Sequence, residues 1–561
     1  MAVLEVQDFD VTYLTKRRPP FQAVKGANLV VNDGEIVGLV GESGSGKSTL
    51  GNAAIRLLNP PGTITGGRAL FQGKDITSLE EEAMRRLRWK EISTVFQGSM
   101  NSLNPVINIE KQFIDVIQTH TGQSQEVARR RAQDVLEMVS IDRQYLKFFP
   151  HELSGGMKQR VCLALSLVLE PRFVLLDEPT TGLDVVVQRS ILQNLRQLQK
   201  EQGFSVLIIS HDLGAIMEVS DRVAVMYNGE IVDTQPAKQL LEHPKHEYSS
   251  MLLDAYRELW LEPGAEDTGF ASKQAVAAPG QVIPPAKDEP VVMRVNNLGK
   301  TFSRRRGFSV SKVAAVDNVS FTLERGKVTA LVGQSGSGKS TIAKLIMGME
   351  KNDAGSILFG STDVRSLRGK ALHEYRSHVQ MVFQDPYSAL NPAHTVIDSL
   401  VRPLRNYKGL GARAARTRAI EMLEAVGLTP AERFIDKNPH QLSGGQRQRV
   451  VVARALAPDP EIVIADEPTS MLDVSIRSEI LGILNRLVRD TNIAMLYITH
   501  DLLSARLLAD EIMVLNQGRV VEQGDADTVI ANPQDAYTRL LLNSIPNPFA
   551  ELNVHTVLDH A

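Results

Sequence analysis

The stretch GESGSGKS, residues 41–48, follows the apolar run EIVGLVG and precedes a helical pattern. In a glycine-rich loop between a strand and a helix, successive backbone N–H groups wrap phosphates, and the lysine neutralises their oxygens. GQSGSGKS, residues 333–340, repeats this pattern after KVTALVG. The sequence thus predicts two nucleotide-phosphate sites, built from Gly41, Ser43, Gly44, Ser45, Gly46, Lys47, Ser48 and Thr49, and from Gly333, Ser335, Gly336, Ser337, Gly338, Lys339, Ser340 and Thr341.

Three further motifs occur twice, with the copies 289 positions apart. They are LSGG, which begins at residues 153 and 442, an Asp-Glu pair at 177–178 and 466–467, and a His-Asp pair at 211–212 and 500–501. A copy without activity would be expected to lose some of these polar residues. The pattern therefore indicates a duplication in which both copies keep their chemistry.

The chain has 561 residues, of which 43% are hydrophobic, so it is long enough for two to four domains with substantial cores. The formal net charge of −3 provides no overall positive field for nucleic acid. Short basic clusters at 85–90, 129–131 and 304–306 are interpreted as solvated surface, with contact to phosphate or a membrane surface as the alternative. We expect a folded protein that does not bind nucleic acid.

The single cysteine, Cys162, lies in the apolar run VCLALSLVL and is expected at a buried helix position. One thiol cannot form an internal disulfide, a zinc cage or an iron–sulfur cluster.

The N-terminal residues alternate like a strand and lack a secretion signal, and no apolar stretch reaches the roughly 18 residues that span a bilayer. We expect a cytosolic chain unless a partner holds it at a membrane.

Strand and helix patterns alternate in each half. Short apolar runs such as FVLLD, EIVIAD, SVLIIS and IAMLYIT are separated by helical stretches, which predicts an α/β fold with a mainly parallel sheet covered on both faces. A stretch rich in Pro, Ala and Gly, residues 262–290, is predicted to be a linker. The predicted parts are a first domain at 1–261 with a helical insert at about 101–150 and a tail at 243–261, a second domain at 291–545 with an insert at about 391–439, and a C-terminal tail at 546–561.

Asp177 and Asp466 end apolar strands, where a carboxylate at the carboxyl edge of the sheet can contact Mg²⁺ or its water shell together with Ser48 or Ser340. The neighbouring Glu178 and Glu467 can act as general bases toward the water that attacks a γ-phosphate. The alternative is a capping or salt-bridged acid. A catalytic role is favoured because the pair recurs at a strand end in both halves.

His211 and His500 follow the next strands, where an imidazole can hydrogen-bond the γ-phosphate. Gln97 and Gln384 lie where a strand meets the helical insert, so their amides can contact Mg²⁺ and the attacking water. Isolated His and Gln residues are more often structural or simply exposed. Because each pair sits in matching contexts, we predict catalytic histidines and nucleotide- and metal-binding glutamines.

LSGGMKQR and LSGGQRQR resemble the signature of the ATP-binding cassette (ABC) ATPases, and the resemblance covers nearly the whole chain outside the linker and the C-terminal end. It implies two tandem P-loop NTPase domains that use ATP and Mg²⁺, each with an antiparallel β subdomain and a helical subdomain. It also implies that signature N–H groups hold the γ-phosphate of the opposite cassette, that two aromatic residues stack on adenine, and that two aspartates lie in a loop linking the sites. The residues concerned are Ser154, Gly155, Gly156, Ser443, Gly444 and Gly445 for the signature, Tyr13 and Phe302 for adenine, and Asp184 and Asp473 for the loop.

One cassette supplies the phosphate loop, metal ligands and base, but lacks a second group of donors that faces the γ-phosphate. Two halves arranged head to tail within one chain would complete each other. The first site would combine Lys47, Gln97, Glu178 and His211 with residues 443–445, and the second Lys339, Gln384, Glu467 and His500 with residues 154–156. We expect ATP to hold the halves together and hydrolysis to release them.

SMNSLNP, SALNP and the tails HPKHEYSSMLLDA and NPQDAYTRLLLNSIPNP resemble the dipeptide, oligopeptide and nickel importer ATPases of bacteria. Tails of that branch normally read close to HPYT, whereas here His246 and Glu247 precede Tyr248 in one half, and Asn532 replaces the histidine in the other. Many members carry a cysteine-rich extension proposed to bind an iron–sulfur cluster. This chain has none, so no such cluster is expected. Residues 98–99, Gly-Ser, also depart from the Asp-Pro pair at 385–386, where contact with one permease subunit would differ.

The leading hypothesis is the energising subunit of an importer, peripheral on the cytoplasmic side of the bacterial inner membrane. The resemblance implies a heterodimer of integral-membrane permease subunits, an extracytoplasmic solute-binding protein, and one chain per transporter. Di- or oligopeptides are the expected solutes, with nickel, glutathione, oligosaccharides or opine-like compounds as alternatives. The rival is a soluble twin-cassette ATPase of ribosomes, which would carry a long, charged helical linker unlike residues 262–290.

Overall fold

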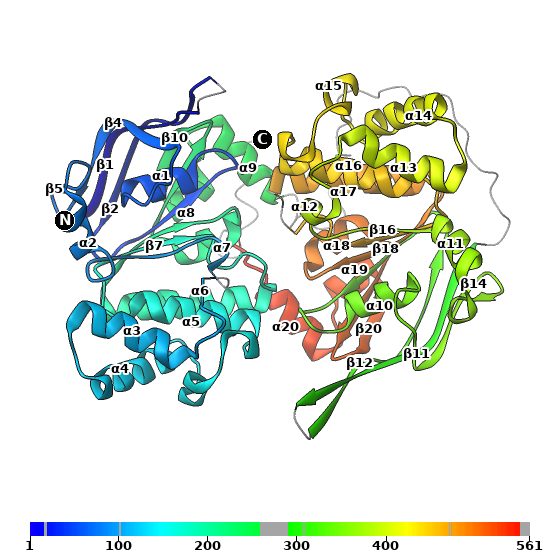
Figure 1. Cartoon of the computed structure of the whole chain (residues 1–561), viewed down its shortest axis with the longest axis horizontal. Coiled ribbons are helices and arrows are strands. Elements are labelled where there is room, and N and C mark those ends of the chain that lie inside the picture. The colour runs from blue at the N-terminus through cyan, green and yellow to red at the C-terminus, as the bar shows by residue number, and fades with distance from the viewer. Residues whose placement is uncertain are drawn as a thin grey trace. The chain divides into compact units, whose positions relative to one another are not determined.

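The computed structural model describes residues 1–15, 19–99, 102–257, 290–306, 309–470, 472 and 474–549 (Figure 1). The chain forms two compact units, Met1–Tyr256 with Ile545–Ala561, and Arg257–Ser544. Among the described residues, the first unit therefore also includes residues 545–549, which follow the second unit in the sequence. Residues 262–289 of the predicted linker and the tail beyond Phe549 lie outside the described residues.

A six-stranded sheet in the order β10-β9-β3-β8-β7-β6 forms the centre of the first unit. Its strands run parallel except β10, which pairs antiparallel with β9. Every residue of β3, β7 and β8 is buried, as expected for parallel strands covered on both faces. The strands are β3 (Ile36–Val40), β6 (Ile92–Val95), β7 (Phe173–Asp177), β8 (Ser205–Ile209), β9 (Arg222–Tyr227) and β10 (Glu230–Pro236).

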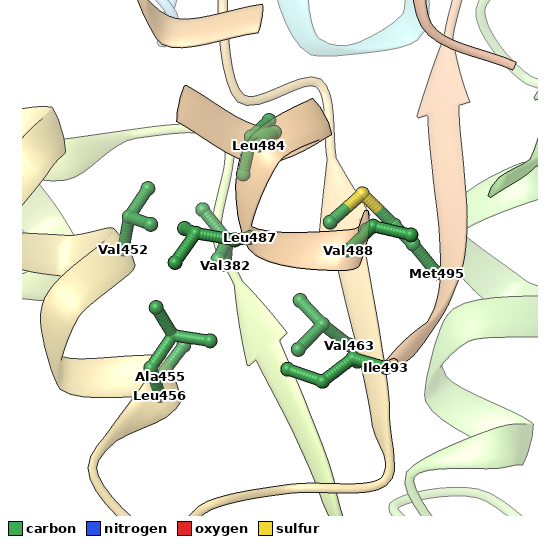
Figure 2. A pocket seen from close by; sticks show the side chains of 10 residues that line it. All are labelled: Val382, Val452, Ala455, Leu456, Val463, Leu484, Leu487, Val488, Ile493 and Met495. Atoms are coloured by element: carbon green, nitrogen blue, oxygen red, sulfur yellow. The ribbon is translucent and has the colours of Figure 1, made fainter. Parts of the chain in front are cut away.

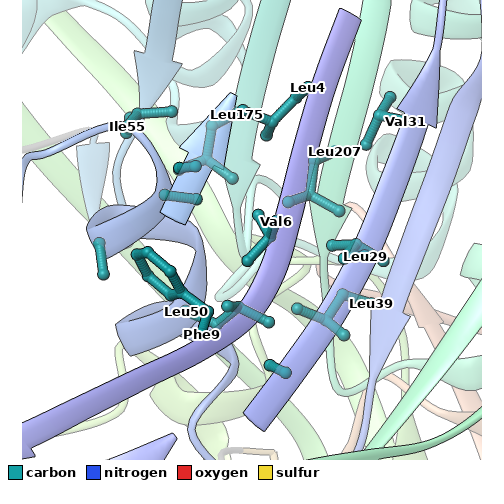
Figure 3. Close-up of a cluster of buried hydrophobic side chains, with 14 of the residues drawn as sticks. Leu4, Val6, Phe9, Leu29, Val31, Leu39, Leu50, Ile55, Leu175 and Leu207 are labelled. Carbon is teal, nitrogen blue, oxygen red and sulfur yellow. The ribbon is translucent and has the colours of Figure 1, made fainter. Parts of the chain in front are cut away.

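A second, antiparallel sheet packs its apolar face toward the central sheet and α1. Its order is β2-β1-β4-β5, with β1 (Ala2–Tyr13), β2 (Phe21–Asn32), β4 (Gly62–Phe71) and β5 (Lys74–Asp75). Leu4, Val6 and, beyond a register shift, Phe9 of β1 share a core with Leu50 of α1 and Leu207 of β8 (Figure 3). This core fixes the phosphate loop, which lies between β3 and α1, against both sheets.

The helices of the first unit include a helical insert between β6 and β7. Within it, Asn108 and Ser124 cap α3 and α4 by accepting hydrogen bonds from backbone N–H groups, and the buried residues of each helix recur at helical spacing. The helices are α1 (Lys47–Ala54), α2 (Glu81–Leu87), α3 (Ile109–Thr121), α4 (Gln125–Met138), α5 (Gly155–Leu167), α6 (Val185–Gln202), α7 (Leu213–Val219), α8 (Ala237–Glu242) and α9 (Glu247–Arg257).

The second unit repeats this architecture. Its sheets have the orders β12-β11-β14-β15 and β16-β17-β18-β13-β19-β20. The strands are β11 (Val291–Arg306), β12 (Ser309–Glu324), β13 (Val328–Val332), β14 (Ala354–Phe359), β15 (Thr362–Asp363), β16 (Val379–Val382), β17 (Ile462–Asp466), β18 (Ala494–Thr499), β19 (Glu511–Asn516) and β20 (Arg519–Asp525). The helices are α10 (Lys339–Ile346), α11 (Gly369–His378), α12 (Pro386–Ala389), α13 (Val396–Lys408), α14 (Ala412–Ala425), α15 (Glu432–Ile435), α16 (Gly444–Leu456), α17 (Val474–Thr491), α18 (Leu502–Leu508), α19 (Ala526–Ala531) and α20 (Ala536–Ser544).

The last described residues complete the first unit around Tyr256, near the end of α9. Its hydroxyl donates a hydrogen bond to the carbonyl oxygen of Pro546 over 2.9 Å, and its ring centroid lies 6.1 Å from that of Phe549. Tyr256 is buried. The segment that starts at Ile545 therefore contributes core contacts to the first unit.

A small apolar cavity lies beneath α16 and α17 in the second unit (Figure 2). Aliphatic side chains line it, together with one methionine, so it is part of the core and lacks the polar partners that a bound water would need. The lining residues are Val382, Val452, Ala455, Leu456, Val463, Leu484, Leu487, Val488, Ile493 and Met495.

Across the described ranges, no helix combines the length and apolar character required to cross a membrane.

Candidate active site

The phosphate loops adopt the same glycine-dependent conformation in both units. Gly46 caps α1 with a φ of 106°, and a Cβ atom there would lie 2.4 Å from the carbonyl oxygen of Ala23. Gly338 caps α10 with a φ of 112°, and its Cβ would lie 2.2 Å from the carbonyl oxygen of Ala315. Another residue type would be strained at φ and would clash with the backbone. The predicted loops therefore depend on glycine for steric reasons.

Each loop lysine is buried in the middle of its loop. Lys47 is 5% exposed, and its Nζ atom donates to the carbonyl oxygens of Gly41 and Glu42, both over 2.7 Å. Lys339 is equally buried and donates to the corresponding carbonyls, over 2.6 and 2.9 Å. A positive charge is thus held at the centre of the loop, where the lysine ammonium could pair with nucleotide phosphate oxygens.

Ser48 and Asp177 form a pair of oxygens suited to Mg²⁺. The Ser48 Oγ atom donates to Asp177 Oδ1 over 2.8 Å, and Asp177 is 2% exposed at the end of β7. Burial raises the pKa of Asp177 above its ordinary value, although the Ser48 hydrogen bond and the charge of Lys47 oppose this. Ionised Asp177 is therefore costly until a cation approaches.

The second unit repeats this pair with Ser340 and Asp466. Burial and the charge of Glu467 raise the pKa of Asp466, although the hydrogen bond from Ser340 opposes this. Mg²⁺ commonly takes one or two protein oxygens and completes its octahedron with water and phosphate oxygens. Among the described residues, no three or more His, Cys, Asp and Glu side chains are grouped to hold a metal. The two oxygens of each unit fit a Mg²⁺ ion that arrives with nucleotide, and that ion would neutralise phosphate charge.

Glu178 follows β7 in a left-handed backbone conformation. Its φ is 48°, and its N–H donates to the carbonyl oxygen of Ile209 over 2.9 Å. Glu467 has a φ of 45° and the same bond, to Ile498, over 2.8 Å. A positive φ is uncommon for glutamate and marks local strain that the surrounding structure must hold in place. The turn brings the glutamate carboxylate to the sheet edge immediately after the buried aspartate.

The predicted glutamine and histidine both contact this glutamate. Gln97 Nε2 donates to Glu178 Oε2 over 2.9 Å, while Nδ1 of His211 lies 3.3 Å from Glu178 Oε1. The second unit has the same arrangement, with distances of 2.7 and 3.3 Å among Gln384, Glu467 and His500. The structure thus brings the predicted amide, carboxylate and imidazole together in both units.

This cluster keeps the glutamate ionised. Burial opposes ionisation of Glu178, yet the hydrogen bond and charge of His211, the hydroxyl of Thr181 and the charge of Lys47 lower its pKa to about 2. The pKa of Glu467 is also lowered, because contacts with His500 and the charge of Lys339 outweigh burial. Both carboxylates are therefore ionised at neutral pH.

Thr181 is a contact that sequence reasoning missed. Its Oγ1 atom donates to Glu178 Oε2 over 2.9 Å. The second unit has Ser470 at this position, and its hydroxyl instead donates to the backbone carbonyl of Glu467 over 3.1 Å. The signal available in the sequence was a hydroxyl residue three positions after the glutamate in both copies. The two carboxylates consequently have different hydrogen-bond environments.

The signature serines begin two helices. Ser154 caps α5, and its Oγ accepts from the N–H of Met157 over 3.3 Å. Ser443 caps α16 in the same way, and the Gln446 side chain also accepts from the Ser443 N–H over 3.1 Å, which completes a capping box. The helix N-termini leave backbone donors that suit an anion. Met157 cannot accept this bond, so the two signature helices differ in their caps.

The second signature glycines also allow close helix packing. A Cβ atom on Gly156 would lie 2.6 Å from Cγ1 of Val187 in α6, and one on Gly445 would lie 2.7 Å from Cγ2 of Ile476 in α17. Packing alone would therefore disfavour a larger residue here. Close helix packing therefore explains the glycine at these two positions, in addition to the predicted phosphate contact.

The remaining predicted residues have different surroundings. The Tyr13 hydroxyl lies 3.2 Å from Thr49 Oγ1, so this ring adjoins the helix after the phosphate loop. Phe302 lies on β11 and is 42% exposed as a residue, with Lys300 Nζ 5.3 Å from its ring centroid. Asp184 caps α6 by accepting from the N–H of Val187 over 3.1 Å. Asp473 lies outside the described residues. Roles of these residues toward adenine or between the sites stay predictions.

Two phosphate loops, each with a Ser-Asp pair and a Gln-Glu-His cluster, define a P-loop nucleoside triphosphatase with duplicated catalytic domains. Comparison with protein families matches residues 24–181 and 316–470 to the ABC transporter family. Residues 521–559 match the family described as oligopeptide/dipeptide transporter, C-terminal region. The chain belongs to the ABC transporter family.

Several relatives match along nearly the whole chain. The glutathione import ATP-binding proteins GsiA of Shigella dysenteriae serotype 1 (strain Sd197) and Escherichia coli (strain K12) are each 38% identical over 560 residues, covering 97% of this chain and 89% of theirs. Among solved structures, the dimeric bacterial ABC transporter cassette MJ0796 is 32% identical, with a TM-score of 0.38, and the match covers 42% of this chain and 98% of that one. The chain is an ATP-hydrolysing subunit of an ABC importer.

Proposed function

We propose that this subunit powers the import of di- or oligopeptides, or of a related solute such as glutathione, through two membrane permease subunits. The observation that carries the proposal is the Gln-Glu-His cluster, which both units keep with nearly equal distances. Two sites with intact chemistry favour a cycle in which both ATP molecules act on one conformational change. The relatives named for glutathione import and the matched transporter C-terminal region support the class of solute.

In each site, the glutamate accepts a proton from the attacking water. The water oxygen forms a bond to the γ-phosphorus as the bond to the β–γ bridging oxygen breaks, which yields ADP and phosphate. The lysine neutralises phosphate oxygens, the histidine is positioned to hydrogen-bond the γ-phosphate, and the glutamine orients the water. Because Gln97 begins the segment that leads into the helical insert, movement of the insert can alter the position of this amide.

The second group of donors for each γ-phosphate comes, in this proposal, from the signature of the other half. Ser154 and Ser443 cap helices of 13 residues, long enough for a helix dipole and a set of orphan N–H donors at the first turn. Head-to-tail pairing would give the site of Lys47 the signature at 443–445, and the site of Lys339 the signature at 154–156. One chain would then supply both sites of one transporter.

The proposed partners are a permease heterodimer and an extracytoplasmic solute-binding protein, with this chain bound at the cytoplasmic face of the membrane. Importer relatives that match along nearly the whole chain support this assembly. The same matches do not favour the alternative of a ribosome-associated twin-cassette ATPase. Nickel, oligosaccharides and opine-like compounds remain the alternative solutes to be tested.

Conversion of both proposed bases to the amide tests the chemistry. Glu178→Gln with Glu467→Gln should reduce phosphate release at least about a hundredfold, because general base catalysis contributes about that much, while ATP remains bound. Phosphate release and retained labelled ATP would be measured on the same sample. Glu201→Gln, at the exposed end of α6, is the matched control. Full activity of the double variant would disprove the assignment of the bases.

Uptake assays test the solute. A strain that lacks this gene but keeps its permeases and binding protein would be supplied with a labelled dipeptide, glutathione or nickel. The wild-type gene should restore uptake of the peptide class, and the double glutamine variant should restore none. Restored uptake of nickel with none of either peptide would replace the proposed solute but leave the ATPase assignment intact.

A further inference from the structure

The chain that follows the last strand of each unit contacts the phosphate loop through a tyrosine. We call these stretches, residues 243–257 and 532–544, the tail segments. The backbone N–H of Glu42 donates to the hydroxyl oxygen of Tyr248 over 3.1 Å, and the N–H of Gln334 donates to that of Tyr537 over 3.0 Å. Both copies therefore keep the same contact between tail segment and loop.

Each tyrosine hydroxyl accepts from the N–H of the first peptide group of its loop. The N–H that Tyr248 binds belongs to the peptide between Gly41 and Glu42, and the carbonyl of that same peptide accepts from Lys47 Nζ over 2.7 Å. The peptide between Gly333 and Gln334 is held in the same way, by Tyr537 on one side and the loop lysine on the other, over 3.0 and 2.6 Å. The tyrosine thus fixes the peptide that holds the lysine ammonium.

The tail segments are themselves tied to the last strand by a carboxylate. Asp233 on β10 accepts from the N–H of Lys245 over 2.9 Å. Glu522 on β20 accepts from the N–H groups of Gln534 and Asp535 over 2.7 and 3.1 Å. The two tails differ in sequence but keep this anchor. The tyrosine hydroxyl is therefore positioned from the sheet that carries the loop.

The backbone of each tyrosine, and the ring of Tyr248, are also fixed. The N–H of Tyr248 donates to Nδ1 of His246 over 3.1 Å, and that of Tyr537 to Oδ1 of Asp535 over 2.8 Å. Tyr248 is 4% exposed, and its ring stacks on Tyr227 with centroids 4.2 Å apart. The departures from the HPYT pattern thus retain an acceptor two residues before the tyrosine. This arrangement leaves the hydroxyl little freedom.

We propose that Tyr248 and Tyr537 are positioning residues of the two phosphate sites. Each holds the first peptide of its loop, and through it the lysine, in the conformation that receives nucleotide phosphates. Neither hydroxyl is placed on the glutamate cluster, so the effect falls on nucleotide binding and not on the hydrolytic step. The inference rests on the phosphate sites proposed above.

Removal of both hydroxyls tests this role. In Tyr248→Phe with Tyr537→Phe, the Kd for MgADP, measured by titration calorimetry, should rise about threefold to tenfold, because a partly buried N–H loses its acceptor and the loop is less ordered before binding. The KM for ATP should rise in parallel, with kcat within about twofold of wild type. Tyr227→Phe removes the hydroxyl of the stacked neighbour and should leave the Kd unchanged. An unchanged Kd, or a fall in kcat at constant KM, would overturn the proposal.

A second pair of variants separates this inference from the proposed sites. Lys47→Ala with Lys339→Ala should abolish measurable MgADP binding. If the lysine variant binds normally, the phosphate sites themselves are misassigned; if it does not bind while the double tyrosine variant binds like wild type, the positioning role alone is wrong. Should the double tyrosine variant unfold, Tyr537→Phe at its half-buried position provides the same measurement for one site.

Discussion

At the residue scale, two adjacent carboxylates at the end of one strand have opposite electrostatic environments. The pKa of Asp177 is raised, chiefly by burial, whereas the pKa of Glu178 falls to about 2 because its contacts with His211, Thr181 and Lys47 outweigh burial. Such a division separates their roles. The glutamate is already ionised, as the proposed role of general base requires, while full charge on the aspartate is favoured once a cation is bound.

The shift of Glu178 predicts an acid-dependent loss of stability. Its folded pKa of about 2 lies below the ordinary value of 4.5, so its contribution is present above pH 4.5 and is lost as pH falls toward 2. At pH 4 this loss amounts to roughly 1 kcal/mol. Glu178→Gln should therefore lose less unfolding free energy than wild type between pH 6 and pH 4, as measured by urea unfolding.

The matched control for this measurement is Glu242→Gln, at an exposed position of α8. It should keep the acid sensitivity of wild type. Equal pH dependence in wild type and Glu178→Gln would show that the folded environment does not favour ionised Glu178.

At the element scale, close packing of helices makes particular glycines necessary. A Cβ atom on Gly214 of α7 would lie 1.8 Å from the hydroxyl oxygen of Tyr256 in α9. Gly482, inside α17, has no atom within 4 Å of the corresponding position. The same residue type is therefore required at one helix and dispensable at the other.

Alanine at these two glycines should have effects of opposite sign. Gly214→Ala should lower the free energy of unfolding by about 1–3 kcal/mol, because the ring must shift in a packed core. Gly482→Ala should raise it by about 0.4–1 kcal/mol, because alanine loses less conformational entropy in a helix. Thermal unfolding of both variants checks this, and a fall in stability of equal size in both would contradict the packing argument.

At the scale of the whole molecule, duplication gives two complete clusters but two different signature helices. The capping box of Ser443 and Gln446 is absent from α5, where Met157 occupies the corresponding position. In the proposed head-to-tail pairing, this difference would act on the site of the other half. A substitution in one signature should therefore show whether that signature serves the ATP site of its own half or that of the other half.

Arginine at one signature serine tests the pairing. With Glu467→Gln silencing the second site, Ser443→Arg should abolish the remaining ATP hydrolysis, because its bulk and charge occupy the position of the γ-phosphate donors of the first site. Ser154→Arg in the same background should retain most of it. The Glu178→Gln background should exchange the two outcomes. The reverse result in both backgrounds would show that each signature serves its own cassette.

Much of the site follows from local sequence, and the rest depends on tertiary approach. The P-loops and the acidic pairs were predictable because their residues are close in sequence and lie at strand ends. The left-handed conformation of Glu178 and the hydroxyl of Thr181 were not, because neither has a distinct local pattern. The bond from Glu42 to Tyr248 joins residues 206 positions apart, and no local pattern specifies such a contact. The overall α/β fold needed only the alternation of strand and helix patterns.

The first unit cannot be finished until the second unit has been translated. Tyr256 and its acceptor Pro546 are 290 positions apart, so at roughly 5–20 residues per second a nascent first unit waits roughly 15–60 s for its final contact. During that interval the side of Tyr256 that later meets Pro546 and Phe549 is uncovered on the ribosome. A chain released early would thus have a first unit whose core lacks these contacts. Proteases and chaperones could recognise such an incomplete chain.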